Sequence, residues 1–260
     1  MYYGGTLIEA AFQQLVDIMK KLRGPEGCPW DKEQTHQSLR PYLLEETYEV
    51  LEALDHDNAD NLQEELGDLL LQIVFHAQLA QEKKRFSILD VLTKINRKLI
   101  RRHPHVFGNM QIRTADEQRN HWEHIKKSEG KNSVLEGVPK SLPALLRANR
   151  IQQKAATVGF DWENLDQVWE KVQEEIKELK CAIESKNEKA ISEELGDLLF
   201  SFVNLSRFLK VNPEDVLRQA VDKFTRRFHK VETTLKTKGI NIHDATLEEM
   251  DAVWNRIKKK

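Results

Sequence analysis

The feature of this 260-residue sequence that most limits its possible folds is an internal repeat. The segment EELGDLL occurs at residues 64–70 and again at 193–199, and the pattern EExxE occurs at 45–49 and again at 174–178. Both pairs are offset by 129 residues, so the two motifs have the same spacing in each copy. A repeat of this kind indicates a duplicated structural unit. We therefore expect two related modules in one chain.

Weaker matches extend the repeat toward the end of each copy. At an offset of 125 residues, Asp-Val-Leu at 90–92 matches 215–217, and Arg-Arg at 101–102 matches 226–227. Beyond them, the two copies share a tryptophan followed four residues later by a lysine: Trp122 and Lys126, then Trp254 and Lys258. The duplication therefore covers most of each half.

Apolar side chains recur every three to four positions through most of the chain, as in a helix with one apolar face. Helices are expected from residue 8 to 22 and over 41–54, 59–81 and 88–102. A turn near 185–187 would fold two helices of the second copy antiparallel. Glycine and proline are scarce, at 11 and 7 residues, and no segment alternates as a strand does. The prediction is an all-α fold with two tandem antiparallel helix bundles.

A change in composition separates the two copies. Residues 128–143 contain two glycines, two prolines and three serines, which is typical of a linker or hinge. We therefore predict an N-terminal module at 1–127, a linker at 128–143 and a C-terminal module at 144–260.

Charge and hydropathy argue against several function classes. The net charge of −2 gives no support for general nucleic-acid binding. The longest apolar stretch, 69–75, already contains Gln72, whereas a membrane span needs about 20 apolar residues. Cys28 and Cys181 lie far apart and form no CxxC pair, which favours a reducing, cytoplasmic compartment.

The acidic residues of the repeat have helical spacing. On a helix, Glu174 and Glu178 share a face, and Glu175 and Glu178 are an i, i+3 pair. Glu194 and Asp197 form another i, i+3 pair on the next helix. Acids that meet in this way repel each other unless a cation lies between them, and oxygen ligands alone favour Mg²⁺ or Mn²⁺. The alternative is an ordinary solvated helix face, which is the usual place for a single glutamate.

Two residues make that alternative weaker. Asp197 lies in the apolar segment Leu-Gly-Asp-Leu-Leu-Phe, where a lone carboxylate would be expensive to bury. Gly196 costs a helix about 1 kcal/mol relative to alanine, so we expect it to allow the close approach of a backbone or a ligand. The first copy repeats the same Leu-Gly-Asp-Leu-Leu around Asp68. The sequence therefore predicts a metal site.

Several motifs resemble the MazG family of nucleoside triphosphate pyrophosphohydrolases. The first is EExxE, fifteen residues, then ExxD, which is similar to the signature of the wider all-α NTP pyrophosphohydrolases. The more specific ones are GCPWDKEQT at 27–35, LEETYE at 44–49, RRHPHVF at 101–107 and VGFDW at 158–162. The resemblance covers nearly the whole chain, including the tandem arrangement.

The resemblance implies a homodimer that hydrolyses NTPs and dNTPs to the monophosphate and pyrophosphate, with Mg²⁺, or Mn²⁺ in its place, held mainly by the second module. It implies these metal ligands: Glu175, Glu178, Glu194 and Asp197, with a less certain set at Glu46, Glu49, Glu65 and Asp68. Glu174 joins the catalytic carboxylates, as the group that activates water or as a neighbour of that group. The expected substrate-binding residues are Lys171, Glu174, Glu175, Glu193, Lys223, Arg226, Arg227, Trp254 and Lys258.

The expected phosphate and base contacts have structural alternatives. Lys223, Arg226 and Arg227 share one helix face and could clamp phosphates, or they could form a solvated basic face. Trp254 could stack on the base or pack in a core. In the first module, Lys98, Arg101 and Arg102 precede Pro104, which ends the helix, so we expect that module to be mainly structural with residual metal binding.

Three other functions compete with this one. A di-iron bundle needs paired Glu-x-x-His motifs, and the chain has one, Glu33 to His36, away from the acidic repeats. A histidine–aspartate phosphohydrolase rests only on the adjacent pair His243 and Asp244. The non-enzyme rival is a helical scaffold that retains its acids by descent, and turnover of NTPs would exclude it.

Overall fold

The structure is a computed structural model that describes residues 5–56, 58–110, 114, 117 and 133–258. The chain divides into two compact units, Met1–Ile112 and Arg113–Lys260. The described residues form helices and turns and no strand, so the predicted all-α fold is confirmed. No described helix combines the length and the low polarity that crossing a membrane requires.

The first unit contains four long helices and two short ones among its described residues. They are α1 (Gly5–Leu22), α2 (Pro29–Glu33), α3 (Arg40–Asp55), α4 (Ala59–Glu82), α5 (Ile88–Arg102) and α6 (Pro104–Phe107). The ends of the long helices match the predicted ones to within one residue, except that α1 begins three residues earlier. The short helices α2 and α6 were not predicted, and each begins with a proline, a residue suited to a first turn because its missing N–H needs no partner there.

The core of the first unit forms where α1 and the end of α4 meet. Its buried residues are Met19, Leu39, Val74, Phe75 and Leu79. Arg23 closes one side of this core, because its guanidinium pairs with Glu82 and lies 5.4 Å over the Phe75 ring. These contacts tie the loop after α1 to the end of α4.

The second unit contains five helices among its described residues. They are α8 (Ala144–Ala156), α9 (Leu165–Glu184), α10 (Glu188–Phe208), α11 (Pro213–Thr237) and α12 (Leu247–Lys258). Asparagines cap the N-termini of three of them: Asn164, Asn187 and Asn212 each accept a hydrogen bond from a backbone N–H in the first turn. Helix α12 packs against α11 around Val231 and Val253.

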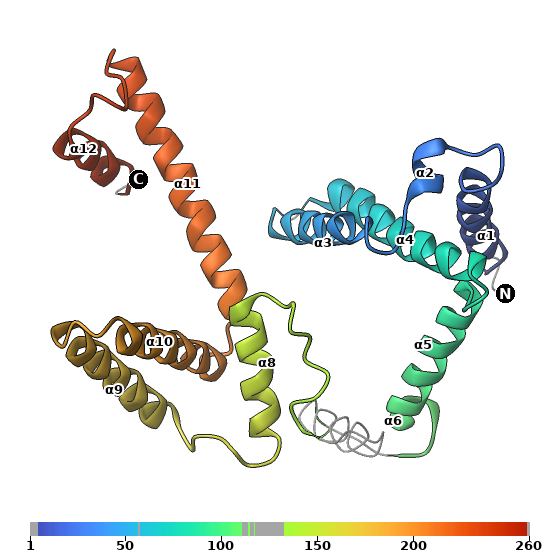
Figure 1. Cartoon of the computed structure of the whole chain (residues 1–260), viewed down its shortest axis with the longest axis horizontal. Helices are drawn as coiled ribbons and strands as arrows, with labels where there is room; N and C mark the ends of the chain where they lie inside the picture. The colour runs from blue at the N-terminus through green and yellow to red at the C-terminus, as the bar shows by residue number, and fades with distance from the viewer. Residues whose placement is uncertain (1–4, 57, 111–113, 115–116, 118–132, 259–260) are drawn as a thin grey trace. The chain divides into compact units, whose positions relative to one another are not determined.

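The turn between α9 and α10 positions the acidic motifs. Ser185 ends α9, Lys186 has a left-handed φ of 53°, and Asn187 caps α10, which confirms the predicted turn at 185–187. The two helices pack against each other from this turn (Figure 1). The same arrangement recurs in α3 and α4 of the first unit.

Two other predictions concern segments that are only partly described. The predicted linker at 128–143 is described from residue 133, where turns lead into α8. The boundary at residue 127 and the pair Trp122 and Lys126 lie outside the described residues. The three-part division of the chain stays a prediction.

Candidate metal and nucleotide site

Three glutamates of the second unit converge. Glu175 and Glu178 project from α9 and Glu194 projects from α10, and one carboxylate oxygen of each lies within 4.8 Å of the others. The antiparallel packing of α9 on α10 brings them together, because the two motifs lie at similar distances from the turn. Hard oxygen ligands at this spacing suit a divalent cation such as Mg²⁺.

Glu175 is the buried member of this cluster, with 5% of its surface exposed. Its Oε1 lies 2.7 Å from Nζ of Lys171, which also lies 3.0 Å from Oε2 of Glu174. These contacts, with that of Glu175 the largest, raise the pKa of Lys171 above its usual range. The other oxygen of Glu175, Oε2, is buried without a hydrogen-bond partner among the described residues. An orphaned carboxylate oxygen is costly, and a bound cation would satisfy it.

The electrostatics of the cluster also favour a cation. Loss of solvation raises the pKa of Glu194, and the negative charges of Glu178, Glu175 and Asp197 raise it further. Carboxylates that crowd in this way are costly to ionise together. A divalent cation among them would remove the repulsion.

Asp197 differs from the expectation that it would be a buried carboxylate. It is exposed, and the residue that is buried is Glu175. Asp197 lies one turn beyond Glu194 on α10 and lines the cavity beside the cluster, although it is not among the three acids that converge. The expected close approach of another backbone at Gly196 is absent too, since a Cβ there would meet no described atom within 4 Å. A role for Asp197 as a fourth ligand stays a prediction.

The remaining acids of the predicted site lie at its edge. Glu174 is exposed and pairs with Lys171, as described above. Glu193 is also exposed, and its carboxylate lies 3.8 Å from Lys189. Contacts of these two residues with substrate stay predictions.

The predicted phosphate and base contacts lie on α11 and α12. Lys223, Arg226 and Arg227 are all on α11, and Lys258 is exposed at the end of α12. Trp254 packs on Phe224 with ring centroids 5.2 Å apart, beside the core that α11 and α12 share. This contact agrees with the second of the two predictions for Trp254, which was that it packs in a core. None of the five lines the cavity next to the acidic cluster, and their roles in binding stay predictions.

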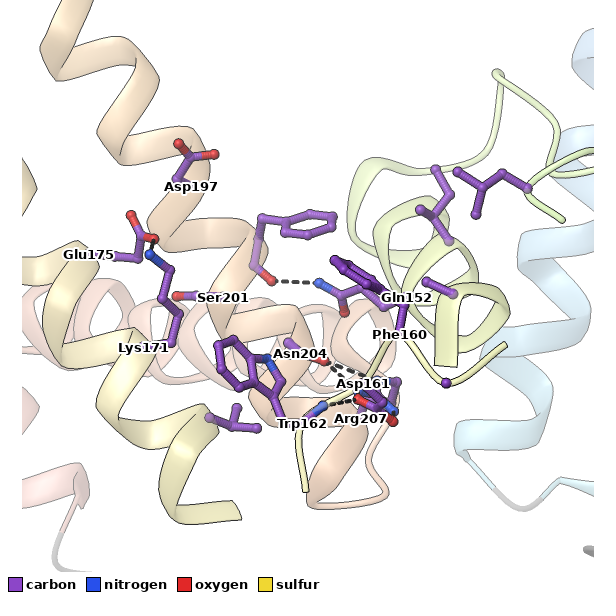
Figure 2. Close-up of a pocket in the computed structure, with 16 residues that line it drawn as sticks. Gln152, Phe160, Asp161, Trp162, Lys171, Glu175, Asp197, Ser201, Asn204 and Arg207 are labelled. Carbon is purple, nitrogen blue, oxygen red and sulfur yellow. Dashed lines mark hydrogen bonds and ion pairs between the residues drawn. The ribbon is translucent and has the colours of Figure 1, made fainter. Parts of the chain in front are cut away.

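That cavity has a volume of about 740 Å³, within the usual range for small-molecule sites. Lys171, Glu175 and Asp197 line one end of it, and Phe160 and Gln152 lie at the other (Figure 2). The complete described lining is Leu135, Ile151, Gln152, Ala155, Gly159, Phe160, Asp161, Trp162, Val168, Lys171, Glu175, Asp197, Phe200, Ser201, Asn204 and Arg207. Gln152, Asn204 and Arg207 were not predicted from the sequence. In the sequence, the motif VGFDW at 158–162 was the feature that could have pointed to this cavity.

The first unit has a matching acidic cluster. Oxygens of Glu46, Glu49 and Glu65 lie within 4.8 Å of one another. Burial raises the pKa of Glu46 and of Glu65, and the neighbouring acids raise both further. The position that matches Lys171 is Tyr42, so the first cluster has no lysine there, and Gln72 donates to Glu46 at 3.4 Å instead.

The fold and the site define an all-α protein with two tandem acidic clusters suited to cations. The model of the MazG nucleotide pyrophosphohydrolase domain matches residues 34–107 and 164–232, once in each unit. The chain belongs to the MazG nucleotide pyrophosphohydrolase family.

Individual relatives agree along nearly the whole chain. The nucleoside triphosphate pyrophosphohydrolase/pyrophosphatase MazG of Thermotoga maritima is 50% identical over 95% of both chains. The nucleoside triphosphate pyrophosphohydrolase of Escherichia coli K12 is 46% identical over 95% of this chain and 97% of its own length. The uncharacterized protein YabN of Bacillus subtilis is 47% identical over 97% of this chain and 53% of its own length.

Proposed function

We propose that this protein hydrolyses nucleoside triphosphates, both NTPs and dNTPs, to the monophosphate and pyrophosphate, with Mg²⁺ bound at the acidic cluster of the second unit. Two observations carry the proposal: Glu175, Glu178 and Glu194 converge, and one oxygen of Glu175 is buried without a hydrogen-bond partner among the described residues. Family membership supports the reaction, since the Thermotoga and Escherichia coli relatives are named for it. Mn²⁺, which has similar ligand preferences, should substitute.

The reaction begins with attack of water on the α-phosphorus. The bond from that phosphorus to the oxygen that bridges it to the β-phosphorus breaks, and pyrophosphate leaves with the electron pair. Glu174, or a carboxylate next to it, accepts the proton of the water. When bound, Mg²⁺ offsets the charge of the triphosphate and lowers the pKa of water. Glu175, Glu178, Glu194 and Asp197 would hold the cation.

Basic residues complete the proposal. Lys171 now neutralises Glu174 and Glu175, and a cation at Glu175 would free its ammonium group to contact a phosphate. Lys223, Arg226 and Arg227 would contact the phosphates from α11, with Glu193, Trp254 and Lys258 at the edge of the nucleotide site. In this proposal, bound substrate or a second subunit brings these residues of α10, α11 and α12 together with the acidic cluster.

A homodimer is part of the proposal. Large apolar side chains are exposed on α10 and α11, where a single chain leaves them in water. They include Leu195, Leu199, Phe202, Leu217, Val221 and Phe224. Exposed apolar surface of this kind marks an interface. A cytoplasmic location is also proposed, and the free thiols of Cys28 and Cys181 agree with a reducing compartment.

The test is a panel of NTPs and dNTPs incubated with the full chain and Mg²⁺, with the products identified. The expected products are the monophosphate and pyrophosphate in equal amounts, and none with excess chelator. Release of the diphosphate and phosphate would show a different hydrolase. Absence of turnover would favour the scaffold, in which the acids are retained without catalysis.

The same assay compares the two units in the intact chain. Glu178→Gln in the second cluster should abolish turnover. Glu49→Gln, at the matching position of the first cluster, should leave most of it. The reverse result would move the main active site to the first unit.

A further inference from the structure

The cavity beside the acidic cluster has a shape and chemistry of its own. It opens between α8, α9 and α10 and the loop 157–164, and Glu175 belongs to both the cluster and the cavity lining. A nucleotide whose phosphates lie at the cluster would therefore have the cavity next to it. A volume of about 740 Å³ leaves ample room for a ligand of nucleoside size.

Aromatic side chains that face solvent form part of the cavity wall. Phe160 is 83% exposed, and Trp162 and Phe200 are 41% and 46% exposed. A phenylalanine this exposed on a loop makes little contribution to a core, and its flat face is available to a ligand. Aromatic faces of this type bind bases by stacking, whatever the base.

Gln152 gives the cavity a directional polar group. This residue is 8% exposed, and its Nε2 donates a hydrogen bond of 2.9 Å to the backbone oxygen of Phe200. Because a backbone carbonyl oxygen can only accept a hydrogen bond, the atom of the Gln152 amide that faces it must be the nitrogen. Oε1 is thereby the free end, and it is buried without a hydrogen-bond partner among the described residues. The cavity wall therefore holds an acceptor that lacks a donor.

An ion pair holds the loop that carries Phe160 and Trp162. Arg207 on α10 forms two hydrogen bonds with the carboxylate of Asp161, and Nη1 lies 2.8 Å from Oδ2. Asn204 accepts from Nε and Nη2 of the same guanidinium, at 3.0 and 2.8 Å. A forked pair of this kind fixes direction as well as distance. The ion pair thus holds the loop segment that contains Phe160 and Trp162 against α10 (Figure 2).

The first unit offers an internal comparison, since it repeats the acidic cluster but differs at two positions that matter here. At the repeat offset, Asn204 corresponds to Phe75, which is buried in the core of that unit. Arg207 corresponds to Gln78, so the guanidinium of the ion pair is missing. Two residues that hold the loop beside the cavity in the second unit are therefore replaced in the first unit.

We propose that this cavity binds the nucleobase of the substrate, with Phe160 stacking on the base and Gln152 Oε1 accepting a hydrogen bond from its exocyclic amino group. The proposal rests on the proposed function, because it gives the triphosphate at the acidic cluster its base site. It locates the base away from Trp254, which packs against Phe224. It also gives a preference: cytosine, which has an amino group at ring position 4, binds better than uracil, which has a carbonyl oxygen there.

The experiment measures KM and equilibrium binding of ATP, CTP and UTP for variants of the full chain, with inorganic tripolyphosphate as a competitor that has no base. Phe160→Ala should weaken all three nucleotides by about 5- to 150-fold, the range of one base stacking contact. It should leave kcat and the inhibition constant of tripolyphosphate within about twofold of the parent values, since neither involves the base. Gln152→Leu should weaken CTP by about 2- to 12-fold and remove its advantage over UTP.

Two controls keep the result specific. Trp169→Ala removes a half-exposed aromatic residue of α9 that does not line the cavity, and Gln153→Leu removes the neighbouring amide. Both should leave nucleotide binding unchanged. Thermal unfolding of each variant should stay within a few degrees of the parent.

Three outcomes overturn the base site. They are unchanged nucleotide binding in Phe160→Ala, an equal loss of tripolyphosphate affinity in that variant, and a loss in Trp254→Phe of the size expected of Phe160→Ala. The last outcome would move the base to α12. Failure of the proposed function is distinguishable, because it appears as absence of monophosphate and pyrophosphate from the parent protein. The binding measurement tests the base site in that case as well.

Discussion

Replacing Glu175 by glutamine tests the acidic cluster at its buried member. The variant keeps the shape of the side chain and removes the charge that would hold the cation. Metal ions contribute several kcal/mol to transition-state stabilisation, so we expect kcat/KM to fall by at least about 100-fold, or about 2.7 kcal/mol. Mg²⁺ should also lose most of its ability to raise the Tm of the protein.

The stability cost of this variant should be small. Lys171 loses its contact with Glu175 but keeps the one with Glu174, and the lysine side chain is 35% exposed. Such partly exposed pairs contribute about 0–1 kcal/mol, and the crowding around Glu194 is relieved at the same time. The Tm in chelator should therefore change by at most about 4 °C.

Steady-state kinetics with product analysis and differential scanning calorimetry make the two measurements. Glu46→Gln, at the same position of the first unit, is the matched control and should keep most of the activity. A Glu175→Gln protein that turns over NTPs at the parent rate would refute the reasoning. A variant that loses activity only because it no longer unfolds cooperatively would refute the stability argument.

Three further predictions follow from the same contacts. In chelator, protonation of Glu194 relieves repulsion among the acids, so the protein should become more stable as the pH falls from about 7 toward 4.5. This gain in stability should disappear as the pH rises through the raised pKa of Glu194. A Tm that falls steadily on acidification would contradict the prediction. Lys171→Met removes a cation that competes with Mg²⁺ for Glu175, so titration calorimetry should show stronger Mg²⁺ binding to the free protein. Kinetics should show a higher KM for ATP. Weaker Mg²⁺ binding would contradict the idea that Mg²⁺ displaces Lys171 from Glu175. Asp161→Asn should destabilise the protein by about 1–3 kcal/mol and raise KM for all nucleotides, because Arg207 loses its paired carboxylate, and unchanged KM would mean that the loop is held by other contacts.

Much of the fold could be predicted because it depends on local periodicity. The apolar spacing located the long helices α1, α3, α4 and α5, and the repeat showed that the pattern occurs twice. The turn at 185–187 followed from small and polar residues between two helical stretches. The spacing of the acids on each helix then made it possible to predict that Glu175, Glu178 and Glu194 come together.

The parts that could not be predicted depend on neighbours distant in the chain. Periodicity assigns a residue to a helix face but does not say what covers that face, so burial was expected at Asp197 and found at Glu175. Asp161 and Arg207 are 46 residues apart, and nothing in the spacing links them. Gln152 has a particular role only because the backbone oxygen of Phe200 takes its amide group.

Anomalous diffraction from crystals grown with Mn²⁺ and an NTP analogue that resists cleavage at the α-phosphate tests the central claim most directly. We expect a peak among the carboxylates of Glu175, Glu178 and Glu194, with the phosphates on the same ion. A peak elsewhere, or phosphates bound with no ion at these three residues, would contradict it.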